Sequence, residues 1–294
     1  MVLDALYHNR QGFLKMSRGD LEGALKEFEE AMAMEPSNMS FRSSRIRCLR
    51  KLGRANEALE EAMKLNLERP NDLETSLVLF ELQEETERYY DALKTLDTLI
   101  EKDPFDPELH WKKAEFLARH ENEGGAMHEI EECVKIDPEN PRYLYARSEM
   151  LLALERPEEA AGNYDRLISL DPYDPEPYYQ KGNILVDLDR PLEAEKYFLK
   201  LVELRPHQVN SYQVLAQFYE TFDRYGDALE CYSSMIRLDP RKANLYFDRG
   251  SIYEGTGKYD EALQDYSEAL RLEPENVEYS LRAARLKERR QADE

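Results

Sequence analysis

The sequence lacks the marks of several large protein classes. Its three cysteines, Cys48, Cys133 and Cys231, lie 85 and 98 residues apart, so they cannot form a disulfide framework and have no metal-ligand spacing. No run approaches the roughly 18 consecutive apolar residues of a membrane-spanning helix. The first thirteen residues lack the basic and apolar regions of a signal peptide. We therefore expect a reducing compartment, and a cytoplasmic location is the simplest interpretation.

Positive charge is also scarce. The 294 residues contain 40 Lys and Arg against 61 Asp and Glu, a formal net charge of −21. Phosphate backbones and anionic bilayers attract basic proteins, so we expect neither a nucleic acid nor a membrane among the partners. Hydrophobic residues make up 41% of the chain, which is enough for a continuous core and excludes a disordered acidic tail.

The motifs of common catalytic sites are missing as well. No two of the five histidines stand three or four residues apart on one helix, as a helical zinc site requires. There is no glycine-rich phosphate loop and no GxSxG nucleophile turn. The sequence therefore predicts a non-catalytic protein with no cofactor and no metal.

What the sequence has in abundance is repetition. Proline recurs every 34 residues, at Pro36, Pro70, Pro104, Pro138, Pro172, Pro206, Pro240 and Pro274. Twelve residues before each proline stands an alanine: Ala24, Ala58, Ala92, Ala126, Ala160, Ala194, Ala228 and Ala262. Eight copies in one register, without insertion or deletion, indicate a repeat protein.

Each copy reads as two amphipathic helices separated by a turn and closed by the proline. The alanine lets the two helices approach, and the residue twelve positions earlier is the matching small residue, such as Gly250 opposite Ala262. In the second and third copies that position holds Ile46 and Phe80. We expect those two helix pairs to be splayed or shifted.

These features resemble the tetratricopeptide repeat. The resemblance includes an aromatic residue or leucine in the second helix: Phe28, Leu96, Tyr164, Phe198, Tyr232 and Tyr266. It implies an all-α fold, a right-handed superhelix (α-solenoid) of eight antiparallel helix pairs, with first helices lining a concave groove. We expect one domain over 1–294, with repeats 5–38, 39–72, 73–106, 107–140, 141–174, 175–208, 209–242 and 243–276 and a capping helix over 277–290.

The capping helix is expected to bury an apolar stripe against the last repeat. The stripe consists of Val277, Leu281, Ala284 and Leu286, and basic residues keep the other face soluble. A docking peptide for another protein is the alternative interpretation of this tail.

Two rows of the first helices are the candidate partner-binding groove. One row carries large aromatics through the fourth to sixth copies and again in the eighth, and the other carries successive glutamates. Their candidate site residues are Trp111, Tyr145, Tyr179, Phe247, Glu81, Glu115, Glu149, Arg47 and Asn183. Aromatic side chains dominate binding energy at interfaces. Packing of these rings on neighbouring helices is the alternative.

Charge along the chain suggests the chemistry of the partner. Residues 1–68 hold 11 basic and 11 acidic side chains, whereas residues 69–138 hold 8 and 19. We therefore expect a groove that is basic at its N-terminal end and acidic in the middle, and an adaptor that binds a peptide or helix with basic and apolar residues. The lysine and asparagine pattern that clamps C-terminal carboxylates in chaperone-binding relatives is absent.

Two other functions stay open from sequence alone. The first is a structural scaffold that self-associates through its ends or edges, and the second is a docking subunit of an enzyme complex whose catalytic chain is separate. Binding of a basic peptide that depends on salt favours the adaptor, whereas growth of mass with concentration favours the scaffold.

Overall fold

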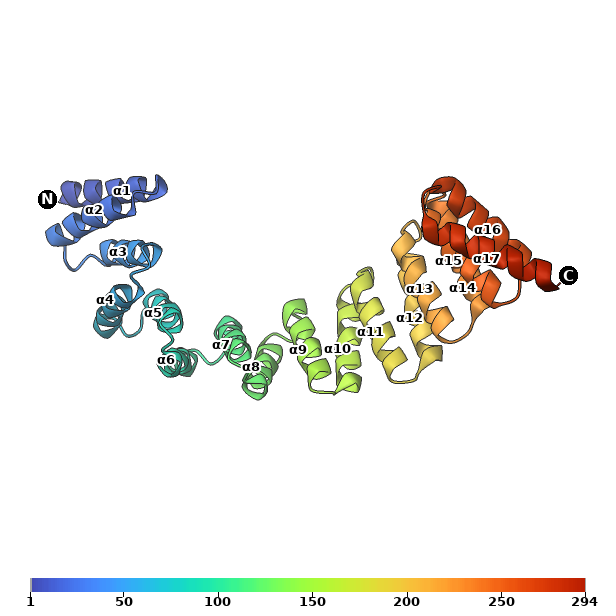
Figure 1. Ribbon diagram of the computed structural model, residues 1–294. Helices are drawn as coiled ribbons and strands as arrows, with labels where there is room; N and C mark the ends of the chain where they lie inside the picture. Colours follow the sequence, from blue (N-terminus) through green and yellow to red (C-terminus); the bar gives the residue numbers. More distant parts are fainter. Residues whose placement is uncertain (1, 294) are drawn as a thin grey trace. The chain divides into compact units, whose positions relative to one another are not determined.

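The computed structural model describes residues 2–293, and in this range the chain is a succession of helices joined by short turns (Figure 1). The helices are α1 (Val2–Ser17), α2 (Leu21–Met34), α3 (Met39–Lys51), α4 (Ala55–Glu68), α5 (Leu73–Glu85), α6 (Tyr89–Lys102), α7 (Pro107–Arg119), α8 (Glu123–Ile136), α9 (Pro141–Ala153), α10 (Pro157–Leu170), α11 (Pro175–Asp187), α12 (Pro191–Leu204), α13 (Val209–Thr221), α14 (Tyr225–Leu238), α15 (Ala243–Gly255), α16 (Tyr259–Leu272) and α17 (Val277–Asp293).

The chain forms two compact units, Met1–Pro138 with α1 to α8 and Glu139–Glu294 with α9 to α17. Within each unit every helix packs on its neighbours in sequence, as an α-solenoid of helix pairs does. From α3 onward, the odd-numbered helices begin 34 residues apart, and so do the even-numbered helices from α2. We call the odd-numbered helices A helices and the even-numbered helices B helices.

Most A helices begin where an Asx side chain caps the first turn. Asn38, Asp72, Asp106, Asn140 and Asp174 precede α3 to α11 and accept a hydrogen bond from a backbone N–H of that turn. Such caps satisfy amides that have no partner within the helix. The start of each of these five A helices is therefore fixed locally, by one residue.

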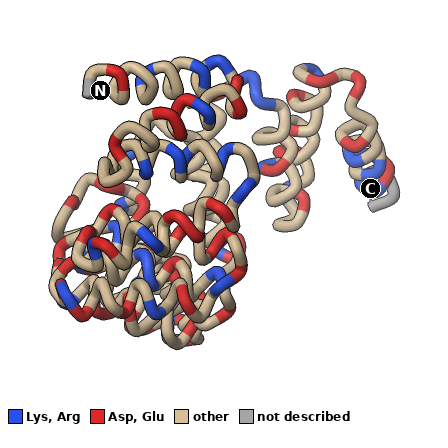
Figure 2. The backbone as a smooth tube through the Cα atoms, turned by 90° about the vertical axis from the view of Figure 1, so that its left-hand side faces the viewer, with Lys and Arg blue, Asp and Glu red and all other residues tan. Residues whose placement is uncertain are grey.

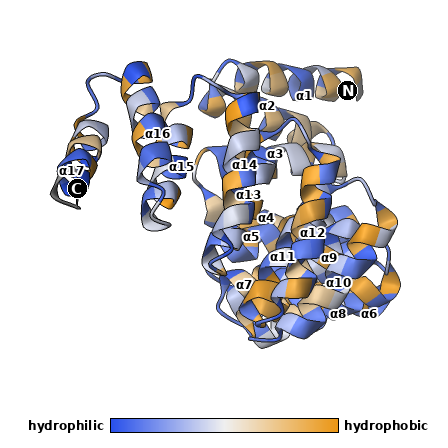
Figure 3. Cartoon of the chain, turned by 90° about the vertical axis from the view of Figure 1, so that its right-hand side faces the viewer, coloured by the Kyte–Doolittle hydropathy of each residue, from blue (hydrophilic) through white to orange (hydrophobic). Residues whose placement is uncertain are grey.

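In six of the eight repeats, helix A carries a small residue where helix B packs against it. The eight repeat alanines are all fully buried. A Cβ added at Gly12 would lie 2.4 Å from the Phe28 ring, and one added at Gly182 would lie 2.5 Å from Phe198. Each ring therefore rests directly on the backbone of helix A. The helices carry both apolar and polar residues (Figure 3).

The expected looseness of the second and third pairs is confirmed. The pairs α3–α4 and α5–α6, which carry Ile46 and Phe80 at the small position, pack together less extensively than the other six pairs among the described residues. Larger side chains at this position hold the two backbones apart.

The turn from helix A to helix B contains one residue in the left-handed region in every repeat. Gly19, Gly53 and Gly257 occupy it in the first, second and eighth repeats. Glutamate or aspartate occupies it in the other five, with φ between 54° and 59°: Glu87, Glu121, Glu155, Asp189 and Asp223. A residue with a Cβ is strained in this conformation by roughly 1–2 kcal/mol, so five of the eight turns store strain.

A pair of substitutions in one repeat tests this strain. At Asp189, glycine should be more stable than alanine by about 1 kcal/mol, because glycine adopts φ 55° without penalty. At Lys196, an exposed position within α12, alanine should be more stable than glycine by about 1 kcal/mol. Urea unfolding of the four variants measures both differences. If the difference in stability between the glycine and alanine variants had the same sign at both positions, the turn at Asp189 would not be strained.

The buried face of α17 differs from the expected stripe. Tyr279, Ala283 and Leu286 are at most 6% exposed, whereas Val277 and Leu281 are 68% and 51% exposed. Only Leu286 of the expected stripe is buried, and Ala284 is exposed. The expectation was therefore wrong about which face is covered.

The physical reason is that α17 packs as an A helix. Tyr279 stacks on Phe247 with 4.6 Å between ring centroids, and this contact sets the rotation of α17. Ala284 stands 34 residues after Gly250, at the position that receives the ring of a B helix. No described helix packs there, so Ala284 stays exposed.

The two faces of α17 should therefore respond differently to truncation. Tyr279→Ala with Leu286→Ala should lower the free energy of unfolding by more than about 2 kcal/mol, because the lost side chains leave a cavity. Val277→Ala with Leu281→Ala should change it by less than about 0.5 kcal/mol. Denaturant unfolding followed by circular dichroism compares the two double variants, and equal effects would refute the observed face.

Candidate partner-binding surface

In the first unit, the candidate residues Trp111 and Glu115 form a local pair on α7. The Trp111 side chain is half-buried, and its Nε1 donates a hydrogen bond to Glu115 Oε1 at 2.7 Å. Glu115 is exposed. The indole is therefore oriented by its own helix while part of its surface faces solvent.

In the second unit, Tyr145 and Tyr179 lie at the corresponding positions of α9 and α11 and are also half-buried. Tyr145 packs edge-on against Tyr164, and its hydroxyl donates to Asp174 at 3.1 Å. Burial, followed by the charge of Asp174, raises the pKa of Tyr145 above its usual value of 10. Tyr179 packs on the core that contains Phe198.

The other candidates of the second unit differ in exposure. Glu149 on α9 is exposed, and Asn183 on α11 is half-buried. Phe247 on α15 is half-buried and packs against two other rings, with Tyr266 at 5.4 Å and Tyr279 at 4.6 Å between centroids. For Phe247, packing on a neighbouring helix accounts for the aromatic residue.

The expected separation of basic and acidic rows is modified by ion pairs between successive A helices. Arg50 of α3 donates to Glu81 of α5 at 2.8 Å and also pairs with Glu85. Glu84 of α5 pairs in turn with Arg119 of α7. The hydrogen bond to Glu85, partly opposed by burial, raises the pKa of Arg50. Both signs of charge are intermixed along the helices (Figure 2), and Glu81 is already partly neutralised within the chain.

One acidic pocket in the second unit lacks such compensation. It encloses about 690 Å³ of empty space, open solvent at its mouth included, and is lined by Glu220, Asp248, Tyr225 and Tyr232, among others. Burial, followed by the charges of Glu220 and Glu278, raises the pKa of Asp248. Asp248 forms no ion pair within the described residues. The sequence rows did not indicate this pocket, because its carboxylates come from different positions in their repeats.

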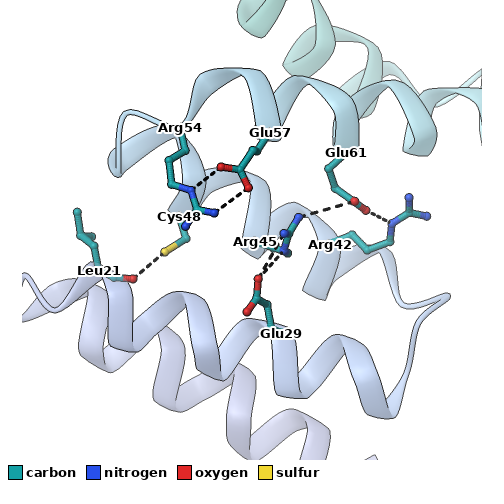
Figure 4. Close-up of polar contacts among 8 residues, drawn as sticks. All are labelled: Leu21, Glu29, Arg42, Arg45, Cys48, Arg54, Glu57 and Glu61. Carbon is teal, nitrogen blue, oxygen red and sulfur yellow. Dashed lines mark hydrogen bonds and ion pairs between the residues drawn. The ribbon is translucent and has the colours of Figure 1, made fainter.

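A second feature that the sequence reading missed is a set of buried and half-buried cations between repeats. Arg45 of α3 lies between Glu29 of α2, 3.3 Å away, and Glu61 of α4, 3.8 Å away (Figure 4). Glu61 also accepts from Arg42 at 2.7 Å. One arginine thus connects the B helix of its own repeat with the B helix of the repeat before it.

The same bridge recurs at 34-residue multiples from Arg45. Lys113 pairs with Asp97 at 2.9 Å and with Glu129 at 2.6 Å. Arg249 bonds Ser233 at 3.0 Å and Asp265 at 2.7 Å. At the same position, Arg147 donates to Asn163 of its own repeat, and Lys181 pairs with Asp165 of the repeat before it. The sequence contains this pattern as five cations spaced at multiples of 34 residues. The cations have a structural role.

Removal of one bridging cation should destabilise the first unit strongly. Lys113→Met leaves Glu129, which is 4% exposed, with only its bond to His110, and should lower stability by about 3 kcal/mol. Lys135→Met removes an exposed pair with Glu132 and should leave the melting midpoint nearly unchanged. Similar midpoints for the two variants would show that the bridge contributes little.

The pH dependence has a definite sign. Burial lowers the pKa of Lys113, but its bonds to Glu129 and Asp97 outweigh burial and raise the pKa above 10.5. The stabilisation is therefore complete below pH 10.5 and is lost as the pH rises through the folded-state value. Lys113→Met should lose less stability than the parent over that interval.

The surface holds no evident metal centre. Among the described residues, no three His, Cys, Asp or Glu side chains are grouped so that they could hold a metal ion. In the same part of the chain, no helix is long and apolar enough to cross a bilayer.

Comparison with known families gives several matches of one kind. Family models described as tetratricopeptide repeat match residues 15–74, 126–175, 175–208 and 215–291. The search of curated proteins gave no match.

Several solved structures are similar to this chain, and one of them shows the same fold. The C-terminal part of a TPR repeat-containing protein from Cytophaga hutchinsonii is similar with a TM-score of 0.58 and 17% identity, over 80% of this chain and 96% of that chain. A tetratricopeptide repeat protein from Parabacteroides merdae aligns over 97% and 98% of the two chains, with 17% identity and a TM-score of 0.45. YrrB, described as a TPR protein with an unusual peptide-binding site, aligns over 65% and 97%, with 18% identity and a TM-score of 0.47.

Proposed function

The chain belongs to the tetratricopeptide repeat family, and from this we propose that it is a non-catalytic adaptor that binds a segment of another protein along its A helices. Membership of the family supports a role in protein–protein interaction in general. We further propose which surface binds the partner and which residue types the partner contributes.

One observation carries the choice of surface. Trp111 in the first unit, and Tyr145 and Tyr179 in the second, occupy the same position of their A helices, and each side chain is half-buried. A ring that is held by packing or a hydrogen bond on one side and is solvated on the other loses little entropy on binding. Rings of this kind are the usual anchors of an interface.

The charges support a partner with basic and apolar residues. Glu149 is exposed one turn from Tyr145 on α9. The pocket at Glu220 and Asp248 combines carboxylates with tyrosine rings, which suit the ammonium or guanidinium group of a partner side chain. Arg47 of α3 is exposed, and Glu81 of α5 is paired with Arg50, so the first unit presents both signs of charge here.

The aromatic anchors can be tested with a matched control. Once a partner has been identified by cross-linking in the native lysate, Trp111→Ala with Tyr145→Ala should weaken its binding by more than about 2 kcal/mol. Tyr90→Ala with Tyr173→Ala removes two rings that are 79% and 82% exposed outside this row and should leave affinity unchanged. Calorimetry measures binding, and thermal melts verify folding.

The outcome separates the two interpretations of the rings. Loss of several kcal/mol of stability in the Trp111 and Tyr145 variant would mean that the rings are core. Unchanged stability with unchanged affinity would move the binding surface elsewhere. Glu149→Lys should lower mainly the association rate and flatten its salt dependence, because exposed charges act chiefly by steering.

A self-associating scaffold is the second candidate, and exposed apolar residues at both terminal helices favour it. Leu3, Leu6 and Tyr7 of α1 are 82%, 51% and 58% exposed, and Val277 and Leu281 of α17 are exposed as well. Sedimentation at increasing concentration distinguishes this candidate: growth in mass that Leu281→Ser abolishes supports it, and a constant monomer mass excludes it. A docking role in an enzyme complex would appear as an enzyme among the cross-linked partners.

A further inference from the structure

The second repeat reverses the size pattern that holds the other helix pairs. In the other seven repeats, helix B carries a leucine, isoleucine or aromatic residue sixteen positions after the small position of helix A, as Phe28 follows Gly12. In the second repeat, helix A carries Ile46 and helix B carries Ala62. The large side chain has moved to the other helix, and the space normally filled by the B-helix side chain is only partly reoccupied.

A pocket lies at this place, between α3, α4 and α5. It is open to solvent and encloses about 480 Å³ of empty space, the solvent at its mouth included. Ile46, Ala62, Leu65 and Val78 form its apolar lining, and the first three are at most 2% exposed. The pair α3–α4 is one of the two loosely packed pairs, so the pocket follows from the sequence reversal. It has room for an aliphatic side chain.

The polar rim carries two arginines and one glutamate. Arg50 is engaged by Glu81 and Glu85. Arg47 is exposed and makes no ion pair within the part of the chain that the structure describes. Glu74, at the first turn of α5, is exposed on the opposite rim. Arg47 is thus the cation of the rim that is available to a carboxylate from outside.

We propose that this pocket takes a leucine, isoleucine or methionine side chain from a partner segment that places an aspartate or glutamate next to Arg47. This inference rests on the proposed function, because it requires that the chain binds a segment of another protein. It adds an anchor of different chemistry from the aromatic row, because the aromatic row suits basic residues and this pocket suits an aliphatic residue beside an acid.

The test uses a random twelve-residue peptide library displayed on phage, selected on the full chain and on variants of it. Ala62→Leu fills the pocket from helix B, Arg47→Glu reverses the free charge of the rim, and Lys64→Glu makes the same charge change at an exposed position of α4 outside the pocket lining. Peptides enriched on the parent should carry an aliphatic residue with an acid within a few positions. They should bind Lys64→Glu as they bind the parent.

Affinity of the selected peptides gives the quantitative criterion. Arg47→Glu should weaken them at least tenfold, as expected for loss of a charge-assisted contact and its replacement by repulsion. Ala62→Leu should weaken them at least as much. Thermal melts show whether Ala62→Leu folds, and Arg47→Glu, at an exposed position, keeps the test decisive if it does not.

Three results would overturn the proposal. Selection of the same peptides with equal affinity on parent and Ala62→Leu would show that the pocket is not used. Enriched peptides with basic rather than acidic residues beside the aliphatic one would refute the role of Arg47. Peptides weakened equally by Lys64→Glu would show that only overall charge matters.

Failure here is distinguishable from failure of the adaptor function. The pocket variants leave Trp111 and Tyr145 intact, and the Trp111 and Tyr145 variant leaves the pocket intact. A partner that binds Ala62→Leu normally but fails on the aromatic variant refutes the pocket and retains the adaptor, whereas the reverse pattern retains the pocket and moves the main surface away from the aromatic row.

Discussion

The contact between a B-helix side chain and a small residue of helix A determines how each repeat is built. Where Phe28 rests on Gly12 and Phe198 on Gly182, the backbones approach closely, and the remaining faces of helix A are directed away from the pair. Where Ile46 or Phe80 takes the small position, the pair packs less extensively. A pocket with an apolar lining lies beside Ile46 and Ala62, where the sizes are reversed.

Most of the fold could be predicted from sequence because its determinants are local. Prolines, capping residues and apolar spacing act within a few residues, and the 34-residue register repeats them. The orientation of α17 could not be predicted in this way. It depends on the stacking of Tyr279 on Phe247, which lies in the preceding A helix, and an apolar stripe on α17 alone gives no information about that neighbour. The left-handed conformations of Glu121 and Asp223 could not be predicted either, because among the turn residues only glycine indicates a positive φ from its sequence identity.

The positions of the candidate surface residues in the repeat could be predicted from the sequence, but the exposure of their side chains could not. Positions such as Trp111 and Tyr145 follow from helix periodicity. How much of a ring is covered depends on the next helix, as the packing of Tyr279 of α17 on the half-buried Phe247 shows. The neutralisation of Glu81 by Arg50 joins residues 31 positions apart on separate A helices, so a count of charges along the chain overestimates the free negative charge. A count of charges along the chain also does not show which carboxylates lack a partner, and the carboxylate of Asp248 was missed for this reason.

The cations shared between repeats have a consequence for how such a chain can be shortened or lengthened. Lys113 needs Asp97 from the repeat before it as well as Glu129 from its own, and Arg45 likewise needs Glu29 and Glu61. The third and seventh repeats carry Leu79 and Leu215 at this position instead. Excision of a whole repeat would preserve the helical register but would place some cations beside an unsuitable predecessor. The repeats are therefore not interchangeable modules, and each boundary is matched to the particular pair of repeats that it joins.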